Sequence, residues 1–278
     1  MRVDAHHHVW QLDRGDYGWL HPTPALRAIC RDFALDELRP WLAAAKVGAT
    51  VLVQAAPTLA ETRYLLDVAR SSDGLVRGVV GWADLAAADA IPELTRLAAD
   101  PLLKSVRPML QDLPDPDWIT RPEVQPALAA LPALGLRFEA LVTPRELMPL
   151  VRALQRQPDL AVVVDHCAKP DITGRGWQPW ADDLAALARH TGAYCKLSGL
   201  VTEAGFAWTT DMLRRYVAHV LACFGSGRVI WGSDWPVLTL AASYAEWVAA
   251  SDALLAGLTQ AERDAIYGGN AYDFYGLQ

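Results

Sequence analysis

The alternation of strand-like and helix-like patterns in this sequence predicts an α/β fold, a (β/α)8 TIM barrel. The chain has 278 residues, and such barrels commonly fill about 250 residues as a single domain. About eight strand patterns alternate with helical ones, and polar residues end nearly every strand, as they would around one cavity. An open doubly wound sheet is the alternative, but no glycine-rich nucleotide turn follows the first strand. We therefore expect one domain over residues 1–278.

The predicted strands are runs of apolar, often β-branched residues. The first, in residues 2–10, alternates so that His6 and His8 share one face and His7 lies on the other. The later runs end on or near a polar side chain. They occupy residues 50–55, 76–82, 103–108, 136–142, 160–166, 193–198 and 229–234.

Helical patterns separate these strands. A loop comes first: residues 11–22 are polar and aromatic, and loops of this length in compact domains are usually functional lids. The helices follow, one before each later strand, as alternating strand and helix units require. They are expected at residues 35–46, 58–70, 86–99, 122–134, 144–157, 180–190 and 210–224.

Composition and charge exclude several classes of function. Hydrophobic residues make up 52% of the chain and charged residues 21%, which is enough apolar material for a large core. The net charge of −7 includes no basic stripe, so neither nucleic acid nor an anionic membrane is an expected partner. No run approaches the roughly 18 apolar residues of a spanning helix, and the four cysteines form no C-x-x-C pair. We expect a cytoplasmic protein whose partner is a small molecule; its oligomeric state has no signal in the sequence.

Four side chains at predicted strand ends form the candidate site. Asp234 follows a bulky run, and Pro236 cannot continue a strand, so Asp234 should face the catalytic mouth of a barrel. His6 and His8 lie on one face of the first strand, and His166 ends an apolar strand. A lone histidine is more often a core or edge residue, but these four together indicate a catalytic or metal site.

Four motifs resemble the amidohydrolase superfamily. They are DAHHHVW at residues 4–10, DHCAKP at 165–170, KLSG at 196–199 and GSDWP at 232–236. More narrowly, they are similar to its lactonase branch, which includes sugar lactonases such as the L-fuconolactonases and also the pyrone dicarboxylate lactonases. DYGWL at residues 16–20 and the segment at 196–203 favour the sugar lactonases.

The resemblance implies roles for the four candidate residues. His6 and His8 match the first-strand pair of the family, His166 matches its later histidine, and Asp234 matches the aspartate that activates water. Many superfamily members add a lysine or carboxylate on the fourth strand and a histidine on the fifth, where this chain has Arg107 and Glu139. The resemblance therefore implies either no metal or a single divalent ion, most simply zinc, held by His6, His8, His166 and Asp234.

The chemistry of these residues also fits lactone hydrolysis. A water must lose a proton as it attacks the carbonyl, and the resulting oxyanion must be stabilised. Asp234 can take the proton, and imidazoles, a metal or Arg107 can hold the oxyanion. Arg107 could instead anchor carboxylates inside the barrel, and Lys196 could either bind sugar hydroxyls or pair with an acid. Further candidate substrate contacts are Gln54 and Trp82, which end strands, and Trp19, which suits stacking on a sugar ring.

The sequence thus predicts a lactonase that opens a sugar-acid lactone, with L-fuconolactone as the best single candidate. Two alternatives within the superfamily are a pyrone dicarboxylate lactonase, which calls for several arginines at the mouth, and a metal-dependent decarboxylase. A sugar-binding barrel without catalysis is a third, but binding alone requires no carboxylate among imidazoles.

Overall fold

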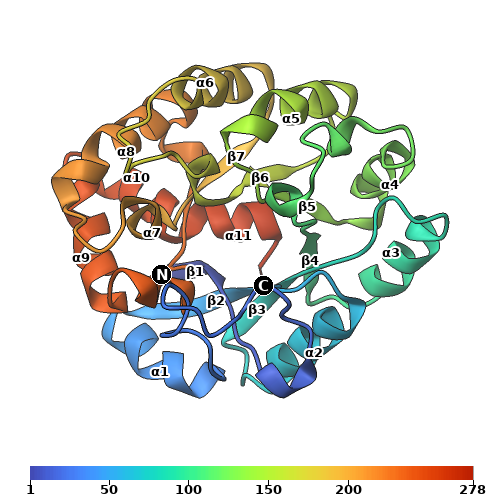
Figure 1. Ribbon diagram of the computed structural model, residues 1–278, viewed down its shortest axis with the longest axis horizontal. Coiled ribbons are helices and arrows are strands. Elements are labelled where there is room, and N and C mark those ends of the chain that lie inside the picture. Colours follow the sequence, from blue (N-terminus) through green and yellow to red (C-terminus); the bar gives the residue numbers. More distant parts are fainter. Residues whose placement is uncertain (278) are drawn as a thin grey trace.

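The computed structural model describes residues 1–277 and confirms the predicted (β/α)8 barrel (Figure 1). Eight strands pair in sequence order, and all neighbouring strands run parallel. The strands are β1 (Arg2–His7), β2 (Val47–Val53), β3 (Val76–Gly81), β4 (Leu103–Val106), β5 (Arg137–Ala140), β6 (Val162–Val164), β7 (Tyr194–Leu197) and β8 (Val229–Trp231).

Helices form the outer ring, and local sequence signals start several of them. The Thr58 side chain accepts a hydrogen bond from the Glu61 N–H at the start of α2, and Thr209 accepts one from Met212 at the start of α8. Within residues 1–277, no helix is both long and apolar enough to cross a membrane. The helices are α1 (Leu35–Ala44), α2 (Leu59–Arg70), α3 (Ala90–Ala98), α4 (Gln125–Ala130), α5 (Pro144–Arg156), α6 (Trp180–His190), α7 (Leu200–Ala204), α8 (Thr210–Phe224), α9 (Tyr244–Leu254), α10 (Gln260–Asp264) and α11 (Asn270–Tyr275).

The structure departs from the predicted elements in two respects. The sequence patterns did not predict α7 or α9 to α11; α7 and α10 span only five residues each, too few for a periodic pattern. In addition, every strand stops one to three residues before its predicted end, so that His8 lies just beyond β1. The strand β6 stops at Val164 and β8 at Trp231, two and three residues early. His166 and Asp234 have φ values of 50° and 62°, a left-handed conformation that ends a strand. Turns beyond the strands therefore present both side chains.

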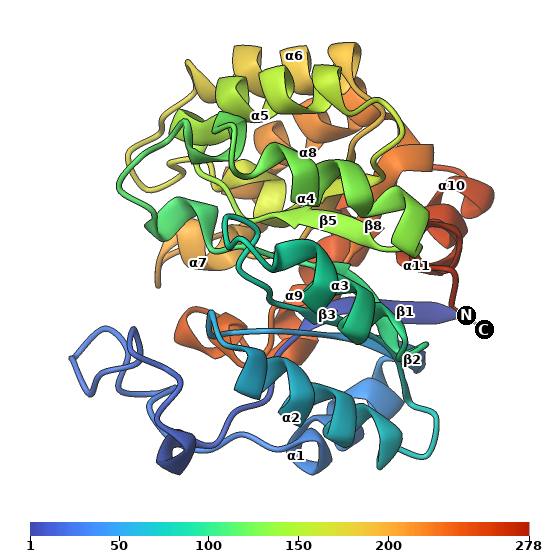
Figure 2. The same cartoon turned by 90° about the vertical axis from the view of Figure 1, so that its right-hand side faces the viewer.

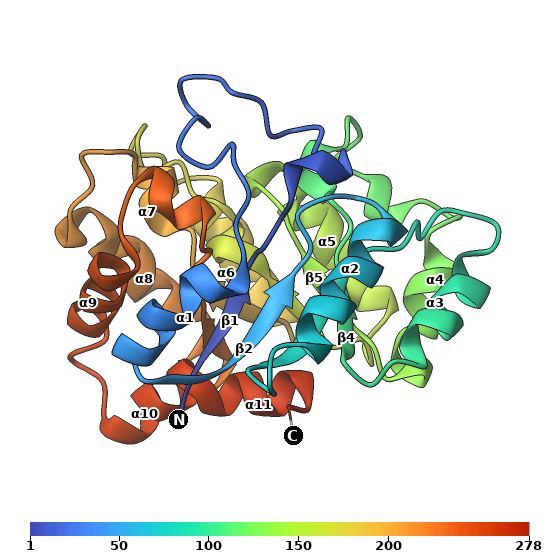
Figure 3. The same ribbon diagram turned by 90° about the horizontal axis from the view of Figure 1, so that it is seen from below.

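One end of the barrel is closed and the other is open. Alternate strand residues such as Val51, Val163 and Ile230 pack inside the barrel. Phe274 and Tyr275 of α11 join this cluster, and Figure 3 places α11 beside the N-terminus, across the end at which the strands begin. The chain between β1 and α1 projects past the opposite end (Figure 2). The polar residues that follow the strands therefore surround the open mouth.

The ring closes between β1 and the segment that follows β8. The His8 N–H donates to the Trp235 carbonyl at 2.7 Å, and the Asp234 N–H donates to the His6 carbonyl at 2.7 Å. Gly232 lies so close to β1 that a Cβ atom there would be 2.7 Å from the Cβ of His6. Only glycine fits at this contact, which fixes the distance between His6 and Asp234.

The Asp4 carboxylate stabilises this junction between β1 and the segment after β8, here called the seam, by accepting three hydrogen bonds. Its carboxylate accepts hydrogen bonds from the Ser233 N–H at 2.8 Å, the Tyr244 hydroxyl at 3.0 Å and the His6 N–H at 3.3 Å. Burial raises the pKa of Asp4 to about 6 despite these donors. The side chain therefore ties β1 to the end of β8 and to α9.

Replacing Asp4 with alanine should destabilise the closed ring. Each buried donor left unpaired costs about 1–3 kcal/mol, so we expect Asp4→Ala to lower the free energy of unfolding by about 2–4 kcal/mol. Urea denaturation followed by circular dichroism measures this, with the exposed Asp159→Ala as a control that should stay within about 0.5 kcal/mol of the parent. Equal stability of the two variants would show that Asp4 does not hold the seam.

Candidate active site

A cavity of about 210 Å³ lies at the carboxyl ends of the strands. The structure brings the predicted His8, His166 and Asp234 together in its wall, along with Arg107 and Trp19. His6 is fully buried directly behind this wall. The other lining residues are Ala55, Met109, Gln111, Asp112, Leu141, Lys169 and Val237.

Three imidazoles surround one oxygen of Asp234. Its Oδ1 atom lies 3.3 Å from Nε2 of His8, 3.7 Å from Nε2 of His6 and 3.8 Å from Nε2 of His166. Burial opposes ionisation of Asp234, but the three imidazoles outweigh it and hold the pKa of this carboxyl below its ordinary value. Asp234 is therefore an ionised carboxylate at neutral pH.

The tautomer of His8 is fixed by the barrel backbone. Its Nδ1 lies 2.8 Å from the carbonyl oxygen of Val53, so Nδ1 carries the proton and donates. Nε2 of His8 faces the Asp234 oxygen 3.3 Å away, and in this tautomer Nε2 carries a lone pair. Two acceptors at this distance repel each other unless a proton or a metal ion lies between them.

His166 is presented by an unusual left-handed turn. The φ angles of His166, Cys167, Ala168 and Lys169 all lie between 48° and 57°, and backbone strain of this kind is concentrated at functional sites. Nδ1 of His166 forms a 2.9 Å hydrogen bond with the Ser198 hydroxyl. A Cβ atom on Gly199 would lie 2.7 Å from the imidazole ring, so glycine allows the ring its place. Burial lowers the pKa of His166 to about 4, which keeps this imidazole neutral.

Beneath the histidines lies a group of four buried charges, here called the charge cluster: Arg107, Glu139, Asp165 and Lys196. Lys196 Nζ lies 2.5 Å from Glu139 and 3.2 Å from Asp165, and Arg107 lies 2.9 Å from Asp165. The two acidic and two basic side chains balance each other in charge, as buried charged groups require. Burial raises the pKa of Asp165, but Lys196, His6 and Arg107 outweigh it and hold this pKa well below its ordinary value.

The charge cluster contacts His6 directly. Nδ1 of His6 lies 3.0 Å from Lys196 Nζ and 3.4 Å from Asp165 Oδ1, and Nε2 lies 3.5 Å from Arg107. The Lys196 ammonium can only donate, so its contact requires an unprotonated Nδ1, whereas the Asp165 contact requires a protonated one. In the tautomer whose Nδ1 donates to Asp165, the lone pair of Nε2 can bind a ligand beside Asp234. From the closed end of the barrel, the Tyr275 hydroxyl donates to Glu139.

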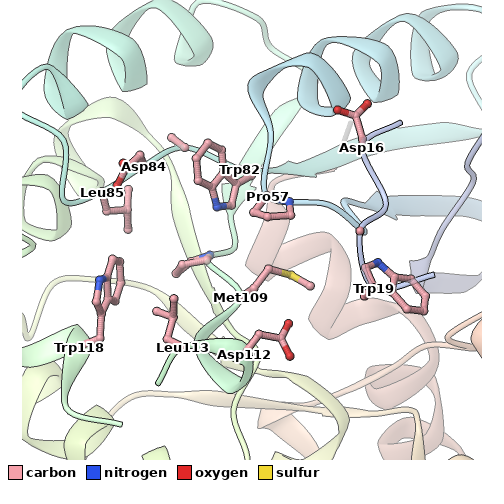
Figure 4. A pocket seen from close by; sticks show the side chains of 13 residues that line it. Asp16, Trp19, Pro57, Trp82, Asp84, Leu85, Met109, Asp112, Leu113 and Trp118 are labelled. Carbon is pink, nitrogen blue, oxygen red and sulfur yellow. The ribbon is translucent and has the colours of Figure 1, made fainter. Parts of the chain in front are cut away.

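The remaining predicted site residues fall into two groups. Arg107 lines the cavity of about 210 Å³, here called the catalytic cavity because it holds the candidate residues, and its guanidinium also pairs with Asp165. Its position is compatible with both uses considered for it from the sequence. Trp19 also lines this cavity, and its indole N–H donates to the Ala55 carbonyl at 2.7 Å. Lys196 and Gln54 are fully buried and do not line it. Trp82 lines a neighbouring cavity instead (Figure 4).

Sequence reasoning did not single out Asp165, Ser198 or Tyr275 as parts of the site. Asp165 stands beside His166 in the DHCAKP motif and Ser198 is part of KLSG, so those motifs contained a signal. Tyr275 lies on α11, more than 130 residues from its partner Glu139, and no local pattern marks it.

The donor set fits one divalent ion. Ligand atoms of His6, His8 and Asp234 all lie within 4.8 Å of one another, and all three residues are buried. Imidazole nitrogens and a carboxylate oxygen are ligands that zinc prefers. His166 belongs to a second such group, with His6 and Asp165, so the two groups share His6.

Comparison with known proteins covers the whole barrel. Residues 3–277 match the amidohydrolase family model. The L-fucono-1,5-lactonase of Burkholderia ambifaria is 46% identical, with 99% of this chain and 95% of that protein covered. The L-fucono-1,5-lactonase of Burkholderia multivorans is 33% identical, with 100% and 96% covered. A crystal structure of an amidohydrolase from Burkholderia multivorans with bound zinc superposes with a TM-score of 0.93 and 32% identity over 100% of both chains. This chain therefore belongs to the amidohydrolase family.

Proposed function

We propose that this enzyme hydrolyses a neutral sugar-acid lactone to the open-chain hydroxy acid, with L-fucono-1,5-lactone as its preferred substrate. The observation that carries the proposal is an ionised Asp234 among three imidazoles at the mouth of the barrel. Lactone hydrolysis needs a base there to take a proton from the attacking water. The 46% identity to a protein named L-fucono-1,5-lactonase supports the choice of substrate.

The proposed reaction uses Asp234 as the base. Water gives a proton to Asp234 as its oxygen bonds to the lactone carbonyl carbon. The carbonyl oxygen becomes an oxyanion, which the Arg107 guanidinium in the cavity wall can stabilise. The ring C–O bond then breaks, and the departing ring oxygen takes the proton from Asp234. The product is an open-chain hydroxy acid, and the base is ionised again.

We also propose that one divalent ion, zinc, is held by His6, His8, His166 and Asp234. When bound, such an ion supplies a Lewis acid that activates water and polarises a carbonyl. The residues at the fourth and fifth strands offer no ligands for a second ion, because Arg107 is a cation and Glu139 is paired with Lys196.

The charges around the catalytic cavity favour a neutral substrate. Apart from the histidines, its cationic lining residues are Arg107 and Lys169, within the described residues 1–277. Arg107 is paired with Asp165 at 2.9 Å, and Lys169 faces Glu203 at 3.9 Å. A dicarboxylate carries two negative charges, and Arg107, which the proposed reaction uses at the oxyanion, could serve only one of them, because Lys169 already faces an acid. Trp19, at the edge of the cavity, is suited to cover a sugar ring.

A panel of lactones followed with a pH indicator tests the proposed function. We expect L-fucono-1,5-lactone to be hydrolysed faster than its epimers by about tenfold or more, because a hydroxyl on the wrong face leaves a buried partner unpaired at a cost of about 1–3 kcal/mol. Sugar lactones should also outpace a pyrone dicarboxylate. Faster hydrolysis of the pyrone than of every sugar lactone would contradict the assignment.

Changing Asp234 to asparagine should remove the base and keep the fold. The amide preserves the shape of the side chain but cannot accept a proton, so we expect kcat to fall by roughly 100- to 10,000-fold. The measurement is kcat on the best lactone, together with thermal unfolding to show that the variant is folded. Asp159→Asn, in an exposed turn, is the control and should match the parent. A variant within about tenfold of the parent would mean that another group is the base.

Metal analysis tests the proposed ion. Elemental analysis after zinc loading and desalting should find a single ion per chain, and chelation should lower turnover without abolishing it. His8→Ala should lose the ion because Nε2 of His8 is a proposed ligand. His21→Ala, on the exposed first loop, should keep it. Two tightly held ions per chain, with all activity lost on their removal, would overturn the single-ion proposal.

A further inference from the structure

A second, larger cavity adjoins the catalytic one. Its volume is about 770 Å³, and Trp19, Met109 and Asp112 line both cavities. Figure 4 shows Trp82 and Trp118 on one side of it and Trp19 on the other. The two cavities share these three wall residues and therefore lie side by side, and the larger one is here called the side cavity.

The side cavity is lined by aromatic rings with unused donors. Trp19, Trp82 and Trp118 come from three separate segments, after β1, after β3 and between β4 and α4. The indole N–H of Trp19 is bonded to Ala55, but those of Trp82 and Trp118 donate to no group within residues 1–277. Indole rings provide flat apolar faces on which sugar rings stack, and a free N–H can donate to a hydroxyl oxygen.

Carboxylates supply the matching acceptors. Asp84 accepts one backbone hydrogen bond, from the Ala86 N–H at 3.0 Å, and Asp112 accepts from the neighbouring Gln111 side chain. Both side chains are exposed at the cavity and retain oxygens that can accept hydrogen bonds from a ligand. A third acid, Asp16, is already paired with Arg14 and Thr58.

This lining discriminates between classes of ligand. None of the lining residues, all within the described chain, is lysine, arginine or histidine, so an anion finds no cationic partner and would face the carboxylates of Asp84 and Asp112. A cation would suit the acids and the ring faces, but it would leave the two indole N–H groups without an acceptor. Hydroxyl groups both donate and accept, so a neutral sugar ring uses the carboxylates, the indole N–H groups and the ring faces together.

We propose that the side cavity is a subsite for a second sugar, and that the enzyme also opens the lactone ring of glycosylated aldonolactones. The lactone occupies the catalytic cavity, the second sugar stacks on Trp118 and Trp82, and the glycosidic link passes the shared residues Trp19 and Met109. This inference rests on the proposed lactonase function. In this arrangement Trp82, which does not line the catalytic cavity, would contact the substrate through the second sugar.

Kinetics on a matched pair of substrates tests the subsite. The pair is an aldonolactone that the enzyme hydrolyses and the same lactone carrying a glucosyl group, attached to each free hydroxyl in turn. For at least one glucosyl derivative, we expect kcat/KM to equal or exceed that of the parent lactone. Trp118→Ala should lower kcat/KM for that derivative by about tenfold, since a large stacking surface is lost. The same variant should leave the parent lactone within about twofold, because Trp118 does not line the catalytic cavity.

Trp41→Ala is the matched control. Trp41 is an exposed tryptophan on α1, 46% accessible, and its replacement should change neither substrate. Thermal unfolding shows whether each variant is folded. The subsite is overturned if every glucosyl derivative is hydrolysed more than about tenfold slower than the parent lactone, or if Trp118→Ala affects both members of the pair equally.

Failure of the proposed lactonase function can be distinguished from failure of the sugar subsite. If no lactone is hydrolysed, the function fails, and saturation-transfer NMR with the same glucosyl lactones then tests the subsite alone. Transfer to the glucose protons that persists in Trp41→Ala and disappears in Trp118→Ala supports a sugar subsite. Transfer that is absent in the parent protein, or unchanged in Trp118→Ala, overturns it.

Discussion

The arrangement of this site depends on the neutral balance of the buried charge cluster of Arg107, Glu139, Asp165 and Lys196. Removing any one of them would leave an uncompensated charge in the buried interior, which typically costs about 3–5 kcal/mol. The four residues come from four successive strand ends, so their pairing also fixes how those strands sit around the axis. Tyr275 extends this network to α11. The helix that closes one end of the barrel is thereby linked to the chemistry at the other.

The histidines gain their geometry from this support and from the backbone. Contacts with Lys196 and Asp165 orient His6 from below, and the Val53 carbonyl sets the proton position of His8. Glycine at two close contacts leaves room for His6 and His166. Asp234 is therefore surrounded by imidazoles whose positions are set before substrate arrives. Such preorganisation costs no rearrangement during the reaction, which is the main source of electrostatic catalysis.

The two cavities share one electrostatic property: among the residues that the structure describes, neither offers a cation that is free of an acidic partner. In the catalytic cavity the cations are paired with acids, and in the side cavity there are none among the described lining residues. Under the two proposals, recognition in both cavities comes from hydrogen bonds and stacking, which suits neutral polyhydroxylated rings. Under this proposal, Trp19 at the shared wall would contact both parts of an extended substrate.

The sequence by itself determined the barrel, the membership of the family and the four residues His6, His8, His166 and Asp234 that meet at its mouth. Periodicity and motifs are local, and the carboxyl ends of parallel strands must converge once a barrel closes. Tertiary structure alone decided that Lys196 lies beneath His6 rather than in the cavity, that Trp82 faces a second cavity, and that Tyr275 reaches Glu139. These outcomes depend on the depth of a side chain along the barrel axis and on contacts between distant segments. A residue pattern records which face a side chain takes, but neither its depth nor its partner.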